Sequence, residues 1–204
     1  MNENKPGAID TVVFDVGWVL VQLDFAPLLT YLGTTGQCYT MPEVIAAINL
    51  EAHERGELSS ARLIDNLLSL TPTLDRVRLK RCWLDMFSPV AAMFILARQL
   101  SATYRVHLLS NVGALHWAHL NQLYDLRALG HGALTSFEAG VMKPDQAIYQ
   151  LAEHRFALDP ARTVFIDDLQ SNVRAARSRG WHAIHHVDPE STIAALRELG
   201  VVWL

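Results

Sequence analysis

Short apolar runs alternate with segments of helical periodicity along most of the chain. The runs are rich in β-branched residues, which is typical of strands buried on both faces of a sheet. They occupy Ile9–Asp15, Val106–Ser110, Thr163–Asp168 and Ala183–Val187. The segments that repeat apolar residues at helical spacing are Met93–Leu100, Ala147–Ala157 and Val173–Arg179. This alternation predicts an α/β fold in which a parallel sheet carries helices on both faces.

The alternation fails between the first and second predicted strands. Residues 25–87 look helical throughout, and a plain crossover between parallel strands needs far fewer residues. We therefore predict a helical cap, residues 23–87, inserted after the first strand of a core domain formed by residues 1–22 and 88–204. The predicted cap helices with apolar residues at i, i+3 and i+4 are Glu43–Glu54, Ser60–Leu70 and Leu74–Met86.

Composition narrows the classes of function. The chain has 204 residues, is 50% hydrophobic, and carries a net charge of −4 without a basic stripe, so nucleic acid is not an expected partner. Cys38 and Cys82 lie far apart, which favours buried thiols over a disulfide framework. The apolar runs are too short to span a bilayer, and the polar first ten residues lack a signal-peptide core. We expect a cytoplasmic protein with no membrane partner, either a monomer or a weak homodimer.

Three of the predicted strands end in polar residues. Asp15 follows the first, Ser110 and Asn111 follow the second, and Asp167 and Asp168 follow a later one. In parallel α/β sheets, ligands bind at the carboxyl ends of the strands. A lone aspartate at a strand end is more often a turn cap. A functional role for Asp15 is therefore supported only by the presence of the other polar residues.

The adjacent carboxylates Asp167 and Asp168 predict a metal site. Two acids close to a third repel one another, and a bound divalent cation relieves that repulsion. Oxygen ligands favour Mg²⁺ over zinc. The plainer alternative is a turn that caps the following helix, and one carboxylate can serve the metal while the other serves the backbone.

Lys143 adds a cation to this set. It lies in the segment GVMKPD, where its ammonium is able to neutralise a phosphoryl oxygen or stabilise the attacking carboxylate. Ser110 and Asn111 offer a hydroxyl, an amide and backbone N–H donors to an oxyanion. A nucleophile, anion donors, a cation and a metal site are together the parts needed for phosphoryl transfer.

The order of these motifs resembles the haloacid dehalogenase-like (HAD) hydrolase superfamily. The matching segments are FDVGWVL, LLSN, GVMKPD and FIDDLQSNVRAA, which span the core domain. The resemblance implies a Rossmann-like core and a covalent aspartyl intermediate on Asp15. It implies that Ser110 binds the transferred phosphoryl group and that Lys143 steadies both that group and Asp15. It also implies that Asp15, Asp168 and the Gly17 carbonyl hold Mg²⁺, with Asp167 close to that site.

The segment HERGELS, residues 53–59, narrows the resemblance to α-D-glucose-1-phosphate phosphatases and hence to a sugar phosphate substrate. One position departs from most phosphatases of the superfamily, which carry a general acid–base aspartate where this chain has Gly17. Losing such a group costs on the order of 10²–10⁴ in rate. Either the leaving group is good, or another residue or water moves the proton. His53, Glu54 and Arg55 are candidates to face the substrate, although a charged helix face is the plainer interpretation.

Two other functions stay open at this stage. A 2-haloacid dehalogenase also uses an aspartate nucleophile, but it needs no metal, and paired carboxylates would repel its acid substrate. A member that lost its acid–base residue would survive as a binding or regulatory protein, and Gly17 is the residue that favours this alternative.

Overall fold

The computed structural model describes residues 8–203, and its centre is a five-stranded parallel sheet in the order β5-β4-β1-β6-β7. This arrangement confirms the predicted α/β fold. The short strand β5 was not predicted, because three residues carry too little periodicity to reveal a strand. The strands are β1 (Thr11–Phe14), β4 (Arg105–Ser110), β5 (Ala133–Thr135), β6 (Thr163–Asp167) and β7 (His182–His185).

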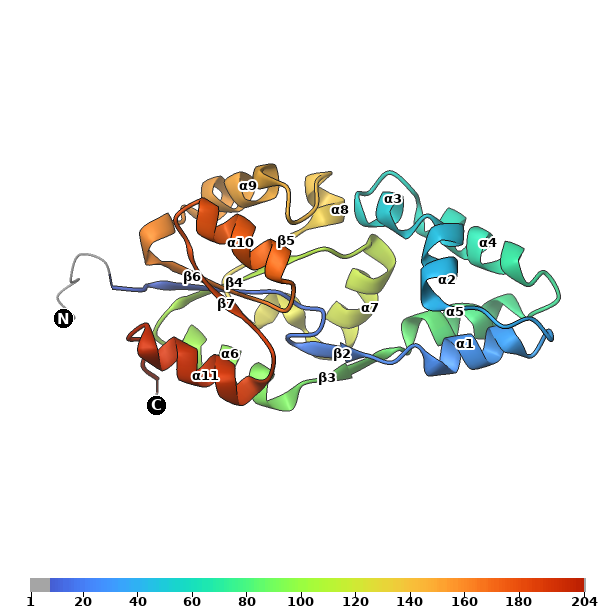
Figure 1. Ribbon diagram of the computed structural model, residues 1–204, viewed down its shortest axis with the longest axis horizontal. Helices are drawn as coiled ribbons and strands as arrows, with labels where there is room; N and C mark the ends of the chain where they lie inside the picture. Colours follow the sequence, from blue (N-terminus) through green and yellow to red (C-terminus); the bar gives the residue numbers. More distant parts are fainter. Residues whose placement is uncertain (1–7, 204) are drawn as a thin grey trace.

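Helices cover both faces of this sheet (Figure 1). Alternate residues of β1 point to opposite faces, so Val12 and Phe14 join one apolar cluster and Val13 joins the other. The first cluster includes residues of α6 (Ala91–Ser101), α7 (Ala114–Tyr124) and α11 (Pro189–Glu198). The second includes residues of α9 (Gln146–Phe156) and α10 (Gln170–Ser178), near the short helix α8 (Ser136–Ala139). None of the helices within residues 8–203 is both long and apolar enough to cross a bilayer.

A helical cap region follows the first strand, as predicted, and lies at one end of the sheet (Figure 1). It has a hydrophobic cluster of its own, centred on Leu28, Leu63 and Trp83. The single helix predicted over Glu43–Glu54 was wrong, because Asn49 adopts a left-handed conformation with φ of 53° and divides it in two. The cap helices are α1 (Ala26–Gly33), α2 (Met41–Ile48), α3 (Leu50–Glu54), α4 (Ser60–Leu70) and α5 (Arg76–Leu84).

A two-stranded antiparallel ribbon connects the cap to the core. Strands β2 (Val21–Leu23) and β3 (Phe87–Pro89) pair with each other on either side of the cap helices. The ribbon, which flanks the segment expected to be helical, was not predicted, since its strands have only three residues each. We propose domain boundaries at residues 23 and 87, in the ribbon. Residues 1–7 and 204 of the predicted core domain lie outside the described residues.

Candidate active site

Asp15 lies one residue past the end of β1, the central strand of the sheet. Its backbone N–H donates to the Ile166 carbonyl at 2.9 Å, which extends the pairing with β6 by one residue. Its carboxylate accepts a 2.7 Å hydrogen bond from the Val16 N–H. The sheet therefore fixes the backbone of this residue while its carboxylate faces a cavity beyond the strand end.

Lys143 is buried beneath this carboxylate. Its Nζ lies 2.9 Å from Asp15 Oδ1 and 2.7 Å from Asp167 Oδ2, and it donates to the Leu109 carbonyl at 2.9 Å. An ammonium taken out of water needs such partners, because an unpaired buried charge is costly. The contacts fix the cation between strands β1, β4 and β6, beside the predicted nucleophile.

Asn111 holds the backbone of Lys143 in place. Its Oδ1 accepts from the Lys143 N–H at 2.8 Å, and its Nδ2 donates to the Lys143 carbonyl at 2.9 Å. The side-chain amide is therefore committed to the protein, and an anion contact from this residue would have to come from its backbone N–H. Ser110, at the end of β4, is buried and lines the neighbouring apolar cavity.

Three carboxylates converge at the strand ends. Ligand oxygens of Asp15, Asp167 and Asp168 all lie within 4.8 Å of one another. Asp167 is fully buried, and its oxygens accept from the Leu169 N–H, the Asn172 amide and Lys143. Asp168 is only partly buried and lines the cavity that Asp15 also lines. An all-carboxylate donor set of this size fits a hard divalent cation such as Mg²⁺.

The pKa values of Asp15 and Asp167 shift in opposite directions. Burial raises the pKa of Asp15 to about 7 despite the nearby Lys143 ammonium, and the Asp167 charge raises it further. Burial also opposes ionisation of Asp167, but the Lys143 charge and hydrogen bond leave its pKa below the usual range. A cation bound beside Asp15 would lower the pKa of its carboxyl group, which favours the nucleophilic carboxylate at neutral pH.

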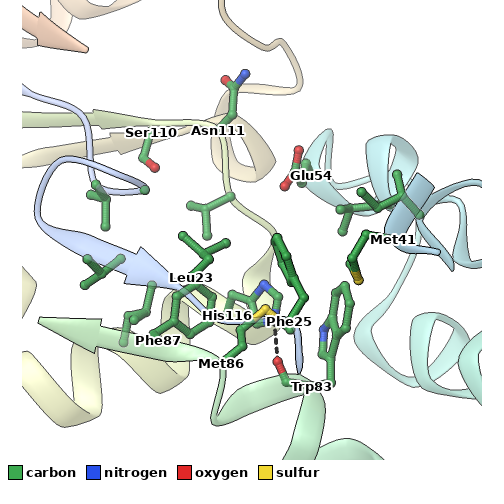
Figure 2. A pocket seen from close by; sticks show the side chains of 17 residues that line it. Leu23, Phe25, Met41, Glu54, Trp83, Met86, Phe87, Ser110, Asn111 and His116 are labelled. Carbon is green, nitrogen blue, oxygen red and sulfur yellow. Dashed lines mark hydrogen bonds between the residues drawn. The ribbon is translucent and has the colours of Figure 1, made fainter. Parts of the chain in front are cut away.

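A second cavity, of about 110 Å³, adjoins this cluster and is lined mainly by apolar side chains. It lies between the core and the cap, with Ser110 and Asn111 on one side and cap residues such as Met41 on the other (Figure 2). His116 is buried in its wall, where it stacks on Trp83 and its Nε2 contacts the Trp83 carbonyl at 3.0 Å. His116 is thus a buried histidine held by the packing between cap and core.

Glu54 comes from the cap and lines both cavities, one of which Asp15 also lines and the other of which has mainly apolar walls. The sequence offered two interpretations of Glu54, either a residue that faces the substrate or part of a charged helix face. The structure places it in the lining of both cavities. The sequence gave little indication that Glu54 lines a cavity. Helix α3 has only five residues, and its periodicity does not show whether another part of the protein covers its polar side.

Comparisons with known proteins agree with this architecture. No family model matches the chain. The chain is 27% identical over 194 residues to the sesquiterpene phosphatase astK of Aspergillus oryzae, covering 92% of this chain and 94% of that protein. It is 42% identical over 60 residues to acyl-CoA dehydrogenase family member 10 of Mus musculus, a match that spans 29% of this chain and only 6% of that protein.

Among solved structures, the chain is similar to a HAD family enzyme of Bacteroides thetaiotaomicron, bt-2542, in complex with magnesium and inorganic phosphate. The two share 22% identity and a TM-score of 0.77, over 87% of this chain and 93% of that one. The chain therefore has the fold of the HAD-like hydrolases, as the motif order predicted. The narrower resemblance to glucose-1-phosphate phosphatases stays a prediction.

Proposed function

We propose that this protein is a Mg²⁺-dependent phosphatase that hydrolyses a small phosphorylated metabolite through an aspartyl-phosphate intermediate. The observation that carries the proposal is the contact of Asp15 with the buried Lys143, inside a cluster of three carboxylates at the strand ends. The magnesium and phosphate bound by the related bt-2542 and the phosphatase activity in the name of astK support it.

Each residue of the cluster has a distinct part in this proposal. The Asp15 carboxylate attacks phosphorus, and the Lys143 ammonium offsets negative charge on Asp15 and on the transferred group. The Ser110 hydroxyl and the Asn111 N–H donate to phosphoryl oxygens. Asp15, Asp168 and the Gly17 carbonyl would hold Mg²⁺, which supplies positive charge beside the carboxylates and the phosphoryl oxygens. Asp167 lies next to that site and holds Lys143.

The organic part of the substrate is proposed to enter the apolar cavity. Its walls include Leu23, Phe25 and Trp83, which offer hydrocarbon and aromatic surface to a ligand. An engineered apolar cavity of about 150 Å³ holds benzene, so a cavity of about 110 Å³ suits a short apolar group. Phosphate esters of apolar alcohols are therefore a second substrate class, beside the sugar phosphates implied by the HERGELS segment. The relative named as a sesquiterpene phosphatase supports this class.

Replacing the nucleophile tests the proposed function. With Mg²⁺ present, we expect the wild-type protein to release phosphate from at least one member of a panel of sugar phosphates and prenyl phosphates. Asp15→Asn should abolish that release, because an amide oxygen is too weak a nucleophile to attack phosphorus. The control is Asp125→Asn, which changes an exposed aspartate outside the site. Full activity of Asp15→Asn would sink the proposal.

Metal binding has a readout that does not depend on turnover. We expect Mg²⁺ to raise the melting temperature of the wild-type protein, since a ligand at 100 times its Kd adds about 2.7 kcal/mol to the stability of the folded state. Asp168→Asn should lose most of this increase, because it removes a charged oxygen ligand. Differential scanning fluorimetry against added MgCl₂ measures the shift, and an unchanged shift in Asp168→Asn would contradict the assignment of this ligand.

The same preparations decide between the proposal and its two alternatives. Chloride release from 2-chloropropionate in EDTA would identify a dehalogenase, which the three converging carboxylates argue against. Binding of a metal fluoride phosphate analogue without turnover of any ester would identify a binding or regulatory protein. Phosphate release that depends on Mg²⁺ and on Asp15 excludes the dehalogenase and the non-enzymatic alternative.

A further inference from the structure

We propose that Glu54, supplied by the cap, is the general acid and base of the site and does the work for which Gly17 has no side chain. The proposal rests on the phosphatase function above. In that reaction the leaving oxygen must gain a proton as its bond to phosphorus breaks, and a water must lose one in the second half. Gly17 contributes no side chain to either transfer, and the Asp15 carboxylate is the nucleophile.

Glu54 lies next to the position that the leaving oxygen would take. The cavity lined by Asp15, Lys143 and Asp168 meets the apolar cavity along a border that both share. Among residues 8–203 that line both, Glu54 is the one with an ionisable side chain. In Figure 2 its carboxylate lies on the cap side of the pocket, across from Asn111 and Ser110. A group bridging the phosphoryl site and the apolar site would pass this carboxylate. The residues that line both cavities are Gly17, Leu23, Glu54 and Asn111.

Two close approaches hold the segment around Glu54 against the core. A Cβ on Gly113, at the start of α7, would lie 2.1 Å from the His53 ring. A Cβ on Gly56 would lie 2.4 Å from the Phe137 carbonyl oxygen, and Gly56 also has a φ of +76°. The His53 ring is itself buried, with Nδ1 2.8 Å from the Leu58 carbonyl. The positions on either side of Glu54 are thus pressed onto the core, which sets the carboxylate at the border of the cavities.

The protonation state of Glu54 suits this role. Burial raises the pKa of its carboxyl group to about 7, the Lys143 charge across the cavity opposes that rise, and Glu51 on the same helix adds to it. Asp15 and Asp168 also face the shared cavity. A carboxyl group with a pKa near 7 is able both to give and to take a proton at neutral pH, which an ordinary exposed glutamate cannot do well.

The two proton transfers balance the reaction. As the bond from Asp15 to phosphorus forms and the ester P–O bond breaks, the Glu54 carboxyl proton passes to the leaving oxygen, releasing an alcohol. The Glu54 carboxylate then takes a proton from the water that attacks the aspartyl phosphate. Breaking the acyl phosphate bond restores the Asp15 carboxylate, releases inorganic phosphate and leaves Glu54 protonated again.

Leaving-group dependence tests this role. The two probes are phenyl phosphate, whose phenolate leaves poorly without a proton, and 2,4-dinitrophenyl phosphate, whose leaving group needs none. We expect Glu54→Gln to lower kcat for phenyl phosphate by about 10²–10⁴-fold, the usual contribution of general acid catalysis. Formation of the aspartyl phosphate from the dinitrophenyl ester, seen as a burst of dinitrophenolate, should keep nearly its wild-type rate. The matched control is Glu57→Gln, three residues along and exposed to solvent, which should leave both unchanged.

The outcomes separate this inference from the proposed function. Equal losses on both esters would show that Glu54 acts in binding or folding and would overturn the inference, as would no loss on either. The dinitrophenolate burst shows that the variant is folded and has a working nucleophile. A wild-type protein that releases phosphate neither from these esters nor from the panel of sugar and prenyl phosphates would overturn the phosphatase proposal itself, and the inference with it.

Discussion

Lys143→Ala is expected to lower the free energy of unfolding by about 3–5 kcal/mol, because removing one partner of a buried ion pair leaves an uncompensated charge. The variant is also expected to lose its turnover. The Lys143 ammonium contacts both Asp15 and Asp167 and is fully buried. Without it, two carboxylates would remain close together in a buried site, where like charges oppose ionisation. The loss of activity follows separately, since no other lysine or arginine side chain lines the cavity in the described part of the chain.

Urea unfolding in EDTA at pH 7 measures the stability loss. The control Lys80→Ala removes an exposed ammonium on α5 and should change stability by no more than about 0.5 kcal/mol. Added Mg²⁺ should recover part of the loss in Lys143→Ala, because a cation at the carboxylates replaces some of the missing positive charge. A stability within 1 kcal/mol of wild type in EDTA would show that the site does not depend on the ion pair.

The sequence predicted the core of the fold and the convergence of the site for the same reason. A strand buried on both faces must be apolar, so a carboxylate directly after one, as at Asp15, marks the carboxyl end of the strand. Parallel strands bring such ends to one edge of the sheet, and Asp167 and Asp168 were placed near Asp15 on that ground. Lys143 was predicted from its motif alone, and its burial between two carboxylates was not foreseeable from spacing.

The way in which the cap packs on the core could not be predicted from the sequence. Helical periodicity predicts that a helix has an apolar face but does not say which polar residue another domain will cover. Glu54 therefore looked like part of a charged surface. The structure shows that Gly56 and Gly113 are each required by a close approach between cap and core. The ribbon of β2 and β3 escaped detection because its strands are three residues long.

Gly113→Ala is expected to reduce turnover by about 10²-fold while leaving the core folded, because an error of about 1 Å in position is enough for such a loss. The new Cβ would lie 2.1 Å from His53 Cδ2 and 2.4 Å from its Nε2, so the cap must shift away. Gly113 itself has a φ of −84°, which alanine adopts without strain, so the effect should come from the contact with His53. A control, Gly33→Ala, adds a Cβ with no heavy atom within 4 Å and should keep full turnover.

A double-mutant cycle isolates this contact. His53→Ala removes the ring that the new Cβ would meet, so the double variant His53→Ala/Gly113→Ala should lose less activity than the sum of the two single effects, with a coupling within the usual 0.5–3 kcal/mol. Steady-state kinetics on one ester supply all four values. Additive losses would mean that Gly113→Ala acts elsewhere, for instance on α7. Coupling would show that the fit of the cap onto the core, and with it the position of Glu54, controls the rate.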